Sequence, residues 1–323
     1  MRSGFLEEWP TLALLAACYA AWGGALFLAT PLWLPLGIAV AALATTLHSS
    51  LTHEAIHGHP TGNDRINHAL VWPALGLLVP YGRFRDTHLA HHNDARLTDP
   101  YDDPESNYLD PDVWARLPRW LRGLLRANNT LLGRVTLGPA IGQIAFMADD
   151  WRAIRAGDRA VARAWVAHIP AALAVLLVVA LAPMPLWAYA IAVYIGHGLL
   201  RIRTFLEHRA HDHTAARTVV IEDRGVLALF FLNNNLHLVH HMHPSAPWFR
   251  LPGLYARDAG RYLSRNQGYR YRSYAQIVYQ YLLRPKDPVP HPLMPDRAAP
   301  HSQAHDSAVP PLTTLRHGGG VSS

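Results

Sequence analysis

Histidine is the residue type in this chain of 323 residues whose number and spacing most clearly indicate chemistry. The sequence holds 21 histidines and a single cysteine, Cys18. One cysteine can form neither a disulfide nor a cysteine-ligated metal centre within the chain. A metal bound here would therefore be held by imidazole nitrogens, which suit zinc, copper, iron and nickel.

Eight of the histidines fall into three short clusters. In the first, His53 and His57 are four residues apart, so on a helix they share one face about one turn apart. The other two clusters repeat the pattern HxxHH, and their histidines are His88, His91 and His92, and His237, His240 and His241. A metal site of this kind takes about three or four side-chain ligands, so eight histidines are too many for one ion. The pattern predicts two neighbouring ions.

A ninth candidate ligand follows the last apolar stretch, in the string TFLEH. His208 is favoured over His211 because it lies closer to the apolar residues and one turn after Thr204. His197 lies eleven residues before His208, about 16 Å along a helix, and cannot share the same metal. His208 is therefore predicted to join the three clusters.

The first cluster also fits a different chemistry. With Glu54 between its histidines it reads HExxH, the pattern of zinc proteases in which the glutamate is the general base. An intramembrane zinc protease of this kind would use His53, Glu54 and His57, and would not need the HxxHH clusters. A non-catalytic metal transporter or store is a third alternative, ranked last because transport sites usually lie near the membrane midplane on broken helices.

The elements that must position the clusters are strongly apolar. Half of all residues are hydrophobic and only 16% are charged, against about 25% in soluble domains. Charged side chains are absent from residues 11–52 and from residues 164–200, and a proline-containing turn interrupts each stretch. Because a membrane-crossing helix needs about 20 residues, each stretch predicts a helical hairpin. The expected spans are residues 11–31, 34–57, 164–182 and 185–208.

The predicted fold is an all-α integral membrane domain over residues 1–284, with two transmembrane hairpins (four transmembrane helices) and a histidine-rich helical cap. Two shorter apolar stretches, residues 66–82 and 136–148, are predicted to be interfacial or partly re-entrant. Residues 285–323 are rich in proline, alanine, histidine and glycine, and are predicted to form a disordered tail.

The arginines predict the orientation of the chain in the membrane. Twelve of them lie between residues 83 and 163, whereas both hairpin turns are uncharged. Since positively charged loops stay in the cytoplasm, both termini and the metal site are expected to be cytosolic, on a bacterial inner membrane. The net charge of +6 does not indicate nucleic acid, because the basic residues accompany long apolar spans.

These motifs resemble those of the membrane fatty-acid-desaturase superfamily, which includes acyl desaturases, lipid hydroxylases and carotenoid ketolases. The likeness rests on HEAIH, HLAHH, HLVHH and TFLEH, and with the hairpins it covers about residues 10–255. It implies a cofactor of two iron ions, O2 as co-substrate and an apolar, lipid-like substrate. The ligands that it implies are His53, His57, His88, His91, His92, His208, His237, His240 and His241.

The resemblance leaves the reaction open. Fatty acyl desaturation in lipid metabolism is the expected function, and hydroxylation or ketolation of a hydrocarbon or carotenoid is the alternative. Thr204 stands where acyl-CoA desaturases have an asparagine, and TFLEH is similar to the TYLPH string of carotenoid ketolases. The string PWFRLP at residues 247–252 is also ketolase-like.

Further residues are expected to support the metal site. Glu54, Thr204 and Asp99 are candidates for contacts with the ligands, and the whole acidic stretch 99–105 either orients imidazoles or forms a solvated turn. Because the chain has no haem or flavin motif and no cysteine cluster, electrons are expected from a separate ferredoxin, rubredoxin or cytochrome. The arginine-rich loops are the expected docking surface for that donor.

Overall fold

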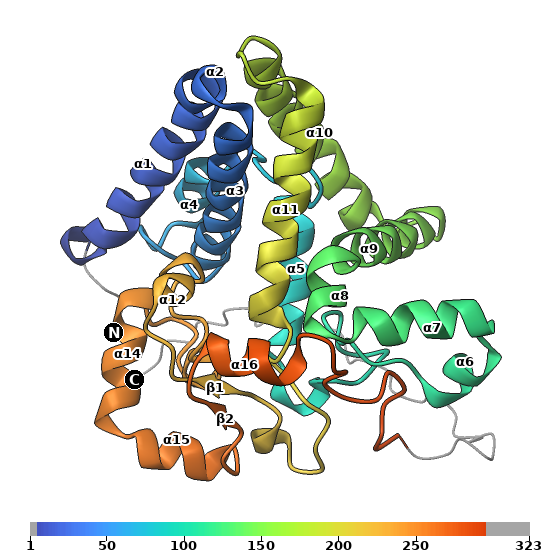
Figure 1. Cartoon of the computed structure of the whole chain (residues 1–323). Coiled ribbons are helices and arrows are strands. Elements are labelled where there is room, and N and C mark those ends of the chain that lie inside the picture. Colours follow the sequence, from blue (N-terminus) through green and yellow to red (C-terminus); the bar gives the residue numbers. More distant parts are fainter. Residues whose placement is uncertain (1–4, 295–323) are drawn as a thin grey trace, which may run out of the picture.

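The computed structural model describes residues 5–294 and is mostly helical (Figure 1). The first helices are α1 (Trp9–Gly24), a π-helical segment (Ala25–Ala29), α2 (Thr30–Leu32), α3 (Leu34–Ile56), α4 (Asp64–Leu70), α5 (Tyr81–His91), α6 (Pro111–Arg116), α7 (Arg119–Asn128), α8 (Leu131–Thr136) and α9 (Gly138–Arg155). They are followed by α10 (Arg159–Ala180), α11 (Leu186–Thr204), α12 (Val226–Phe230), α13 (His237–Met242), α14 (Leu251–Arg257), α15 (Ala259–Arg265) and α16 (Tyr274–Tyr281). Two short parallel strands, β1 (Val220–Ile221) and β2 (Arg270–Tyr271), interrupt the otherwise helical pattern.

Three helical segments are long and apolar enough to cross a membrane, namely Trp9–Leu32, Leu34–Ile56 and Arg159–Ala180. They correspond to the first three expected spans, and the break between the first two is Trp33, whose backbone is extended. Helix α11 does not reach the same hydropathy, because His197, Arg201 and Arg203 interrupt its apolar residues. Length and composition thus identify three of the four expected crossings.

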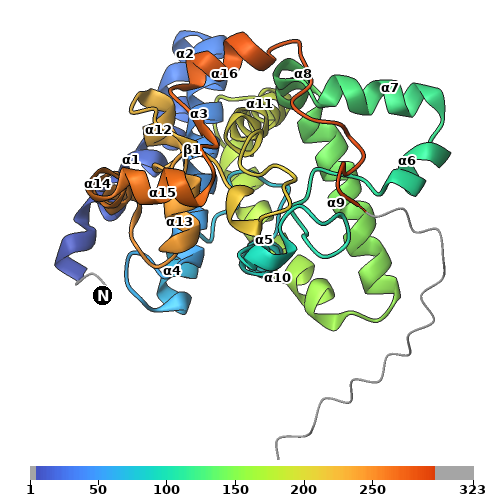
Figure 2. The same cartoon turned by 90° about the horizontal axis from the view of Figure 1, so that it is seen from below.

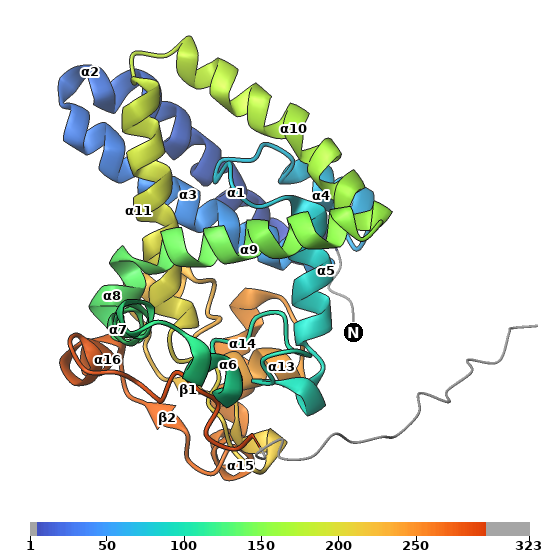
Figure 3. The same cartoon turned by 90° about the vertical axis from the view of Figure 1, so that its right-hand side faces the viewer.

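Helices α3 and α11 form the centre of the apolar part of the molecule. Helix α1 lies beside α3, whereas α10 meets α11 at the turn between them and then diverges from it (Figure 3). The turns that join the helices of each pair lie at the same end (Figures 1 and 3). A Cβ atom at Gly196 would come within 3.0 Å of the Ala42 carbonyl oxygen, so glycine permits this close packing. The same contact is bridged by Thr46, whose hydroxyl lies 2.9 Å from the Ala42 oxygen and 3.2 Å from the Gly196 oxygen.

A non-helical loop, residues 71–80, lies among these helices instead of at the surface. Five carbonyl groups from Leu70 to Leu78 accept hydrogen bonds from side chains of four surrounding helices. The donors are Tyr19, Tyr189, His197, His168 and Gln143, at 2.7 to 3.0 Å. Irregular backbone among apolar helices is tolerated only when its polar groups are satisfied within the protein. Residues 66–82, expected to form an interfacial or partly re-entrant helix, are therefore helical only in α4 and from Tyr81 onward in α5, and the loop leads directly into α5. Their position relative to a membrane stays a prediction.

Helix α9 runs across α11 near the base of the apolar helices (Figure 3). It leaves Ile144, Met147 and Trp151 exposed along one side, at the spacing of one helix face. An interfacial position of residues 136–148 would place this exposed apolar stripe against the membrane, and that position stays a prediction.

The opposite end of the molecule is a compact cap formed by α12 to α16 and the two short strands (Figures 1 and 2). Its core includes Val220, Val239, Leu251 and Tyr255, which are all buried. Residues 285–294 of the expected disordered tail pack against this end of the molecule, for example through a backbone hydrogen bond of 3.0 Å from Lys286 to Asn129. The rest of that tail, residues 295–323, lies outside the described residues.

Candidate metal centre

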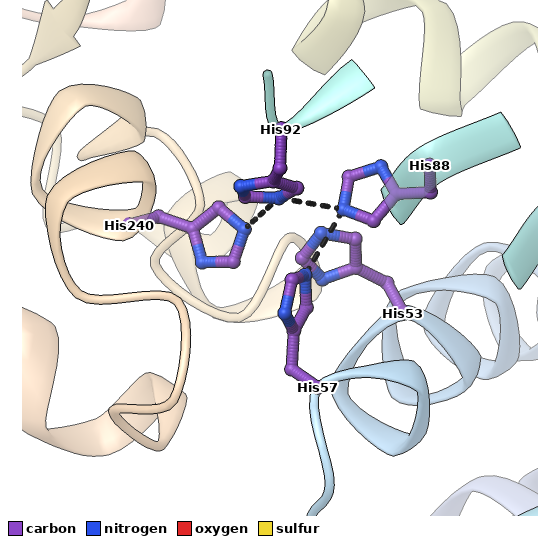
Figure 4. A group of neighbouring side chains, drawn as sticks. All are labelled: His53, His57, His88, His92 and His240. Carbon is purple, nitrogen blue, oxygen red and sulfur yellow. Dashed lines mark hydrogen bonds between the residues drawn. The ribbon is translucent and has the colours of Figure 1, made fainter. Parts of the chain in front are cut away.

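Nine histidines gather at the cap end of α3 and α5, and they form two adjoining groups. In each group the candidate ligand atoms all lie within 4.8 Å of one another. The larger group, shown in Figure 4, consists of His53, His57, His88, His92 and His240. The smaller group consists of His91, His208, His237 and His241. All nine histidines that the sequence predicts as ligands lie in these two groups.

Helix α3 supplies two members of the larger group. His53 lies in its last turn and His57 caps its C-terminus, and their four-residue spacing places the rings 4.8 Å apart. The helix ends because Gly58 follows with a φ of +93°, a conformation that glycine adopts without steric cost. The sequence thus places both imidazoles at the point where the helix leaves the apolar region.

Helices α5 and α13 each divide an HxxHH cluster between the two groups. In α5 the outer pair, His88 and His92, joins the larger group, and His91 joins the smaller one. In α13 the outer pair joins the smaller group, and only His240 joins the larger one. The rings of His92 and His241 stack with centroids 4.3 Å apart, so the groups are direct neighbours.

The ninth histidine comes from an extended segment. Helix α11 ends at Thr204, and His208 then forms an antiparallel bridge with Thr218. His211 lies outside both groups, and its Nδ1 accepts the backbone N–H of His213. The structure therefore brings His208, and not His211, to the other ligands.

Two carboxylates hold imidazoles from outside the groups. Asp103 accepts a hydrogen bond from Nδ1 of His91 at 2.8 Å, and Glu105 accepts one from Nδ1 of His88 at 3.1 Å. The backbone N–H of Thr98 donates to the other Asp103 oxygen at 2.9 Å and fixes that carboxylate. Such contacts set the ring orientation and leave Nε2 as the nitrogen that faces the group.

Two further members of the smaller group have polar partners at Nδ1. The Thr218 hydroxyl lies 3.2 Å from Nδ1 of His208, and the Asn234 amide oxygen lies 3.1 Å from Nδ1 of His237. Glu207 lies 3.7 Å from the same nitrogen of His237. All three partners again occupy the outer nitrogen and leave Nε2 directed inward.

The inward nitrogens are spaced as ligands of a cation would be. Nε2 of His88 lies 3.0 Å from Nε2 of both His57 and His92, and Nε2 of His91 lies 2.9 Å from that of His208. Two nitrogens bound at right angles to one ion, each about 2.1 Å away, are about 3.0 Å apart. Nε2 of His53 is buried without a hydrogen-bond partner. The donor sets therefore fit imidazole-bound metal ions.

The environment sets the charge state of the imidazoles. Burial lowers the pKa of His208 and of His237 well below the ordinary value, and neighbouring histidines lower it further. Burial acts in the same direction on His91, but Glu105 and Asp103 outweigh it and raise the pKa of His91 to about 9. Neutral imidazoles offer a lone pair to a cation, and at His91 an ion would replace the second ring proton.

The other residues expected to support the ligands lie elsewhere. Glu54 is buried, and its carboxylate accepts the backbone N–H of Trp248 at 2.8 Å. Asp99 accepts the backbone N–H groups of Tyr101 and Asp102, as in a turn. Among the described residues, neither Asp99 nor Thr204 forms a hydrogen bond to any of the nine histidines.

The carboxylates that do contact the imidazoles were partly visible in the sequence. Asp103 and Glu105 belong to the acidic stretch 99–105, but sequence gives no means of choosing them over Asp99. Glu207 precedes His208 directly, and Asn234 lies in a run of three asparagines before the third cluster. That run was the available signal for Asn234, because consecutive asparagines at the start of a short buried helix indicate side-chain hydrogen bonds to nearby groups.

A pocket of roughly 460 Å³ opens beside the larger group. It is lined by His57 and His92 of that group, by Leu89, and by the turn that follows α3. Pro244 and Ser245 also line the pocket. The larger group thus has an opening to the surface of the described molecule.

Two comparisons with known proteins bear on this site. The family model described as fatty acid desaturase matches residues 30–274, a range that contains all nine histidines. The chain is also similar to a β-carotene ketolase from Paracoccus sp. (strain N81106 / MBIC 01143). The two are 26% identical over 230 residues, which is 68% of this chain and 74% of the ketolase.

Proposed function

The chain belongs to the fatty acid desaturase family, and we propose from this that it is a membrane oxidoreductase that uses O2 and two histidine-held iron ions to oxidise an apolar, lipid-like substrate. The observation that carries the proposal is the division of nine inward-facing imidazoles into two adjoining groups. The earlier resemblance to this superfamily is confirmed by the family match. The metal and the reaction are the proposed part.

In this proposal each histidine group holds one iron ion. Bound iron would supply the means to activate O2 for attack on an unactivated C–H bond. The chain holds the ligands in place: Asp103 and Glu105 orient His91 and His88 through their Nδ1 atoms. Burial keeps bulk water from His88, which is only 1% exposed.

Two substrate classes follow from the comparisons. Family membership supports fatty acyl desaturation as the first candidate. The likeness to a β-carotene ketolase supports a second, oxygen insertion into a carotenoid or similar hydrocarbon. Thr204 at the end of α11 and the string PWFRLP favour this second class, because both are ketolase-like.

We also propose four membrane crossings, with α11 as the fourth, and a metal site on the cytosolic side. Helix α11 packs along α3 in the centre of the apolar bundle, and its arginines lie in its last turn towards the cap. Twelve arginines lie between residues 83 and 163, in the segment that joins the two expected hairpins, as expected for a cytosolic loop. Labelling of single cysteines in intact cells, with Cys18 replaced, would test this orientation.

The electron donor is proposed to be a separate acidic protein of the ferredoxin, rubredoxin or cytochrome type. Exposed arginines on α6 and α7, Arg116, Arg119 and Arg126, offer a positively charged surface near the cap. Attraction between exposed charges weakens as salt is added, so turnover should fall with ionic strength. Turnover that does not change with ionic strength would count against this surface.

The zinc-protease alternative is less well supported by the geometry. It requires Glu54 beside the metal as a base, yet this carboxylate is engaged with the backbone of Trp248. It also treats the HxxHH clusters as dispensable, whereas His88, His92 and His240 lie in one group with His53 and His57. A transporter is also less well supported, because the groups lie at the cap end of the apolar helices.

The proposal can be tested by expressing the chain with an electron donor in two hosts, one ordinary and one that makes β-carotene. Total lipid is compared by mass spectrometry with that from the His240→Ala variant, and His211→Ala serves as a matched control outside both groups. A product that lacks two hydrogens supports desaturation, and one that gains oxygen supports hydroxylation or ketolation. Purified protein should hold about two iron ions; protein without iron would overturn the proposal.

A further inference from the structure

The C-terminal end of the described chain folds back onto the metal centre. Residues 282–291, here called the strap, lie beyond the part of the chain that the family model matches. Backbone hydrogen bonds attach the strap along its length: Leu132 to Leu282 at 3.0 Å, Lys286 to Asn129 at 3.0 Å and Leu109 to Val289 at 2.9 Å. The strap therefore joins α8 to the loop that follows the acidic stretch.

Lys286 of the strap contacts the backbone of one of the nine histidines. Its side chain is only 8% exposed, and its ammonium group donates to the backbone carbonyl of His208. The Asp287 carboxylate lies 3.4 Å from the same ammonium group. A buried cation is costly unless it is paired and hydrogen-bonded. Lys286 meets that requirement by binding the backbone of a histidine in the smaller group.

Tyr108 provides a second link between the strap and the same segment. Its hydroxyl donates to the Asp287 carboxylate at 2.5 Å and accepts the backbone N–H of Ala210 at 3.0 Å. Tyr108 also follows closely on Asp103 and Glu105, the carboxylates that orient His91 and His88. The strap, the acidic loop and the segment 208–210 are thus joined at two points.

The larger group has no comparable attachment among the described residues of the strap. Its histidines lie on or directly after α3, α5 and α13, where the helix backbone sets their positions. His208 lies outside any helix, and its segment pairs with the extended backbone around Thr218. The position of a ligand on an extended segment must therefore be fixed by contacts with other segments of the chain.

We propose that the strap is a positioning element for the smaller metal group, and that Lys286 holds the backbone of His208 so that this group retains its ion. The inference rests on the proposed function, because it requires an ion at each group. It adds that the two groups retain their ions with different affinity, and that residues outside the range matched by the family model control this difference.

The test compares Lys286→Met with Arg284→Met in the full chain, since both remove a cation from the strap but Arg284 is exposed. Iron per chain is measured by mass spectrometry after gel filtration with a chelator. Wild-type protein and Arg284→Met should keep about two ions, and Lys286→Met about one. Retention of both ions by Lys286→Met, or loss of both together, would overturn the inference. Wild-type protein without iron would overturn the proposed function and the inference with it.

Tyr108→Phe covers the case in which Lys286→Met does not fold, because it keeps the ring and removes only the hydroxyl. The release of iron to a chelator is followed over time, with Tyr279→Phe, at an exposed tyrosine, as control. One of the two ions should leave about tenfold faster than from wild-type protein. Release at the wild-type rate would show that the strap does not hold the smaller group.

Discussion

The two histidine groups use the same side chain but are built in different ways. The larger group takes its members from α3, α5 and α13, where spacings of three or four residues place imidazoles on one helix face. The smaller group includes His208, which lies in an extended segment and depends on Thr218 and Lys286 for its position. Its His91 is held by Asp103 from a loop twelve residues further on.

This difference shows that the histidines of two adjoining sites can be positioned in different ways, either by residues close in the sequence or by residues far apart in it. Helix geometry alone sets the relative position of His53 and His57. The position of His208 relative to His91 depends on segments that are more than one hundred residues apart in the chain. We therefore expect the smaller group to be the more easily disturbed of the two.

The largest expected effect comes from removing one candidate ligand from each histidine group. His240→Ala leaves four histidines in the larger group, and His241→Ala leaves three in the smaller one. Both variants should lose more than about 100-fold in product formation, since a ligand matters at least as much as its hydrogen-bond partner. Iron per chain should fall further in His241→Ala. Equal iron loss in the two variants would contradict the difference between the groups.

A smaller effect is expected from the carboxylates behind the imidazoles. Asp103→Asn weakens the contact to His91 and Glu105→Gln weakens that to His88, so each should reduce iron affinity about 10- to 100-fold. Competition with a chelator should show the loss at the smaller group for Asp103→Asn. For Glu105→Gln the loss should be mainly at the larger group, although this carboxylate also lies 3.9 Å from Nε2 of His91. Asp102→Asn, at an exposed neighbour, is the control. Loss at the same group in both variants would show that the carboxylates do not act separately.

The smallest effect is expected from Glu54→Gln. A glutamine can still accept the backbone N–H of Trp248, so the free energy of unfolding should fall by less than about 1 kcal/mol. Iron content and product formation should stay within about threefold of wild type. The zinc-protease alternative requires a different result: purified protein that holds zinc, and peptide cleavage that Glu54→Gln abolishes while the zinc is retained.

Much of the candidate site could be predicted from sequence because it depends on local spacing. HExxH and HxxHH place histidines on helix faces whatever surrounds them, so eight of the nine members were visible as motifs. His208 could be chosen over His211 from its distance to the apolar stretch. Three of the four expected spans were found by hydropathy alone, which needs no knowledge of packing.

The parts that could not be predicted depend on contacts between distant segments. Nothing local distinguishes Asp103 from Asp99, since both are aspartates in one loop and only the path of that loop brings Asp103 to His91. The stretch 66–82 was recognised as interrupted and apolar, but the side chains that donate to the five carbonyl groups between Leu70 and Leu78 come from four different helices. Residues 285–294 have the composition of a disordered tail, yet they pack through Lys286 and Asp287.

The sequence by itself determined the family of this protein and the type of side chain that gathers at its candidate metal centre, because imidazole number, imidazole spacing and apolar length act within one helix turn or one membrane span. Only the tertiary structure decided how the nine histidines divide into groups of five and four. It also decided which carboxylate supports which ring and what holds His208 in place. These features depend on contacts between side chains that are distant in the sequence, and residue spacing alone does not predict such contacts.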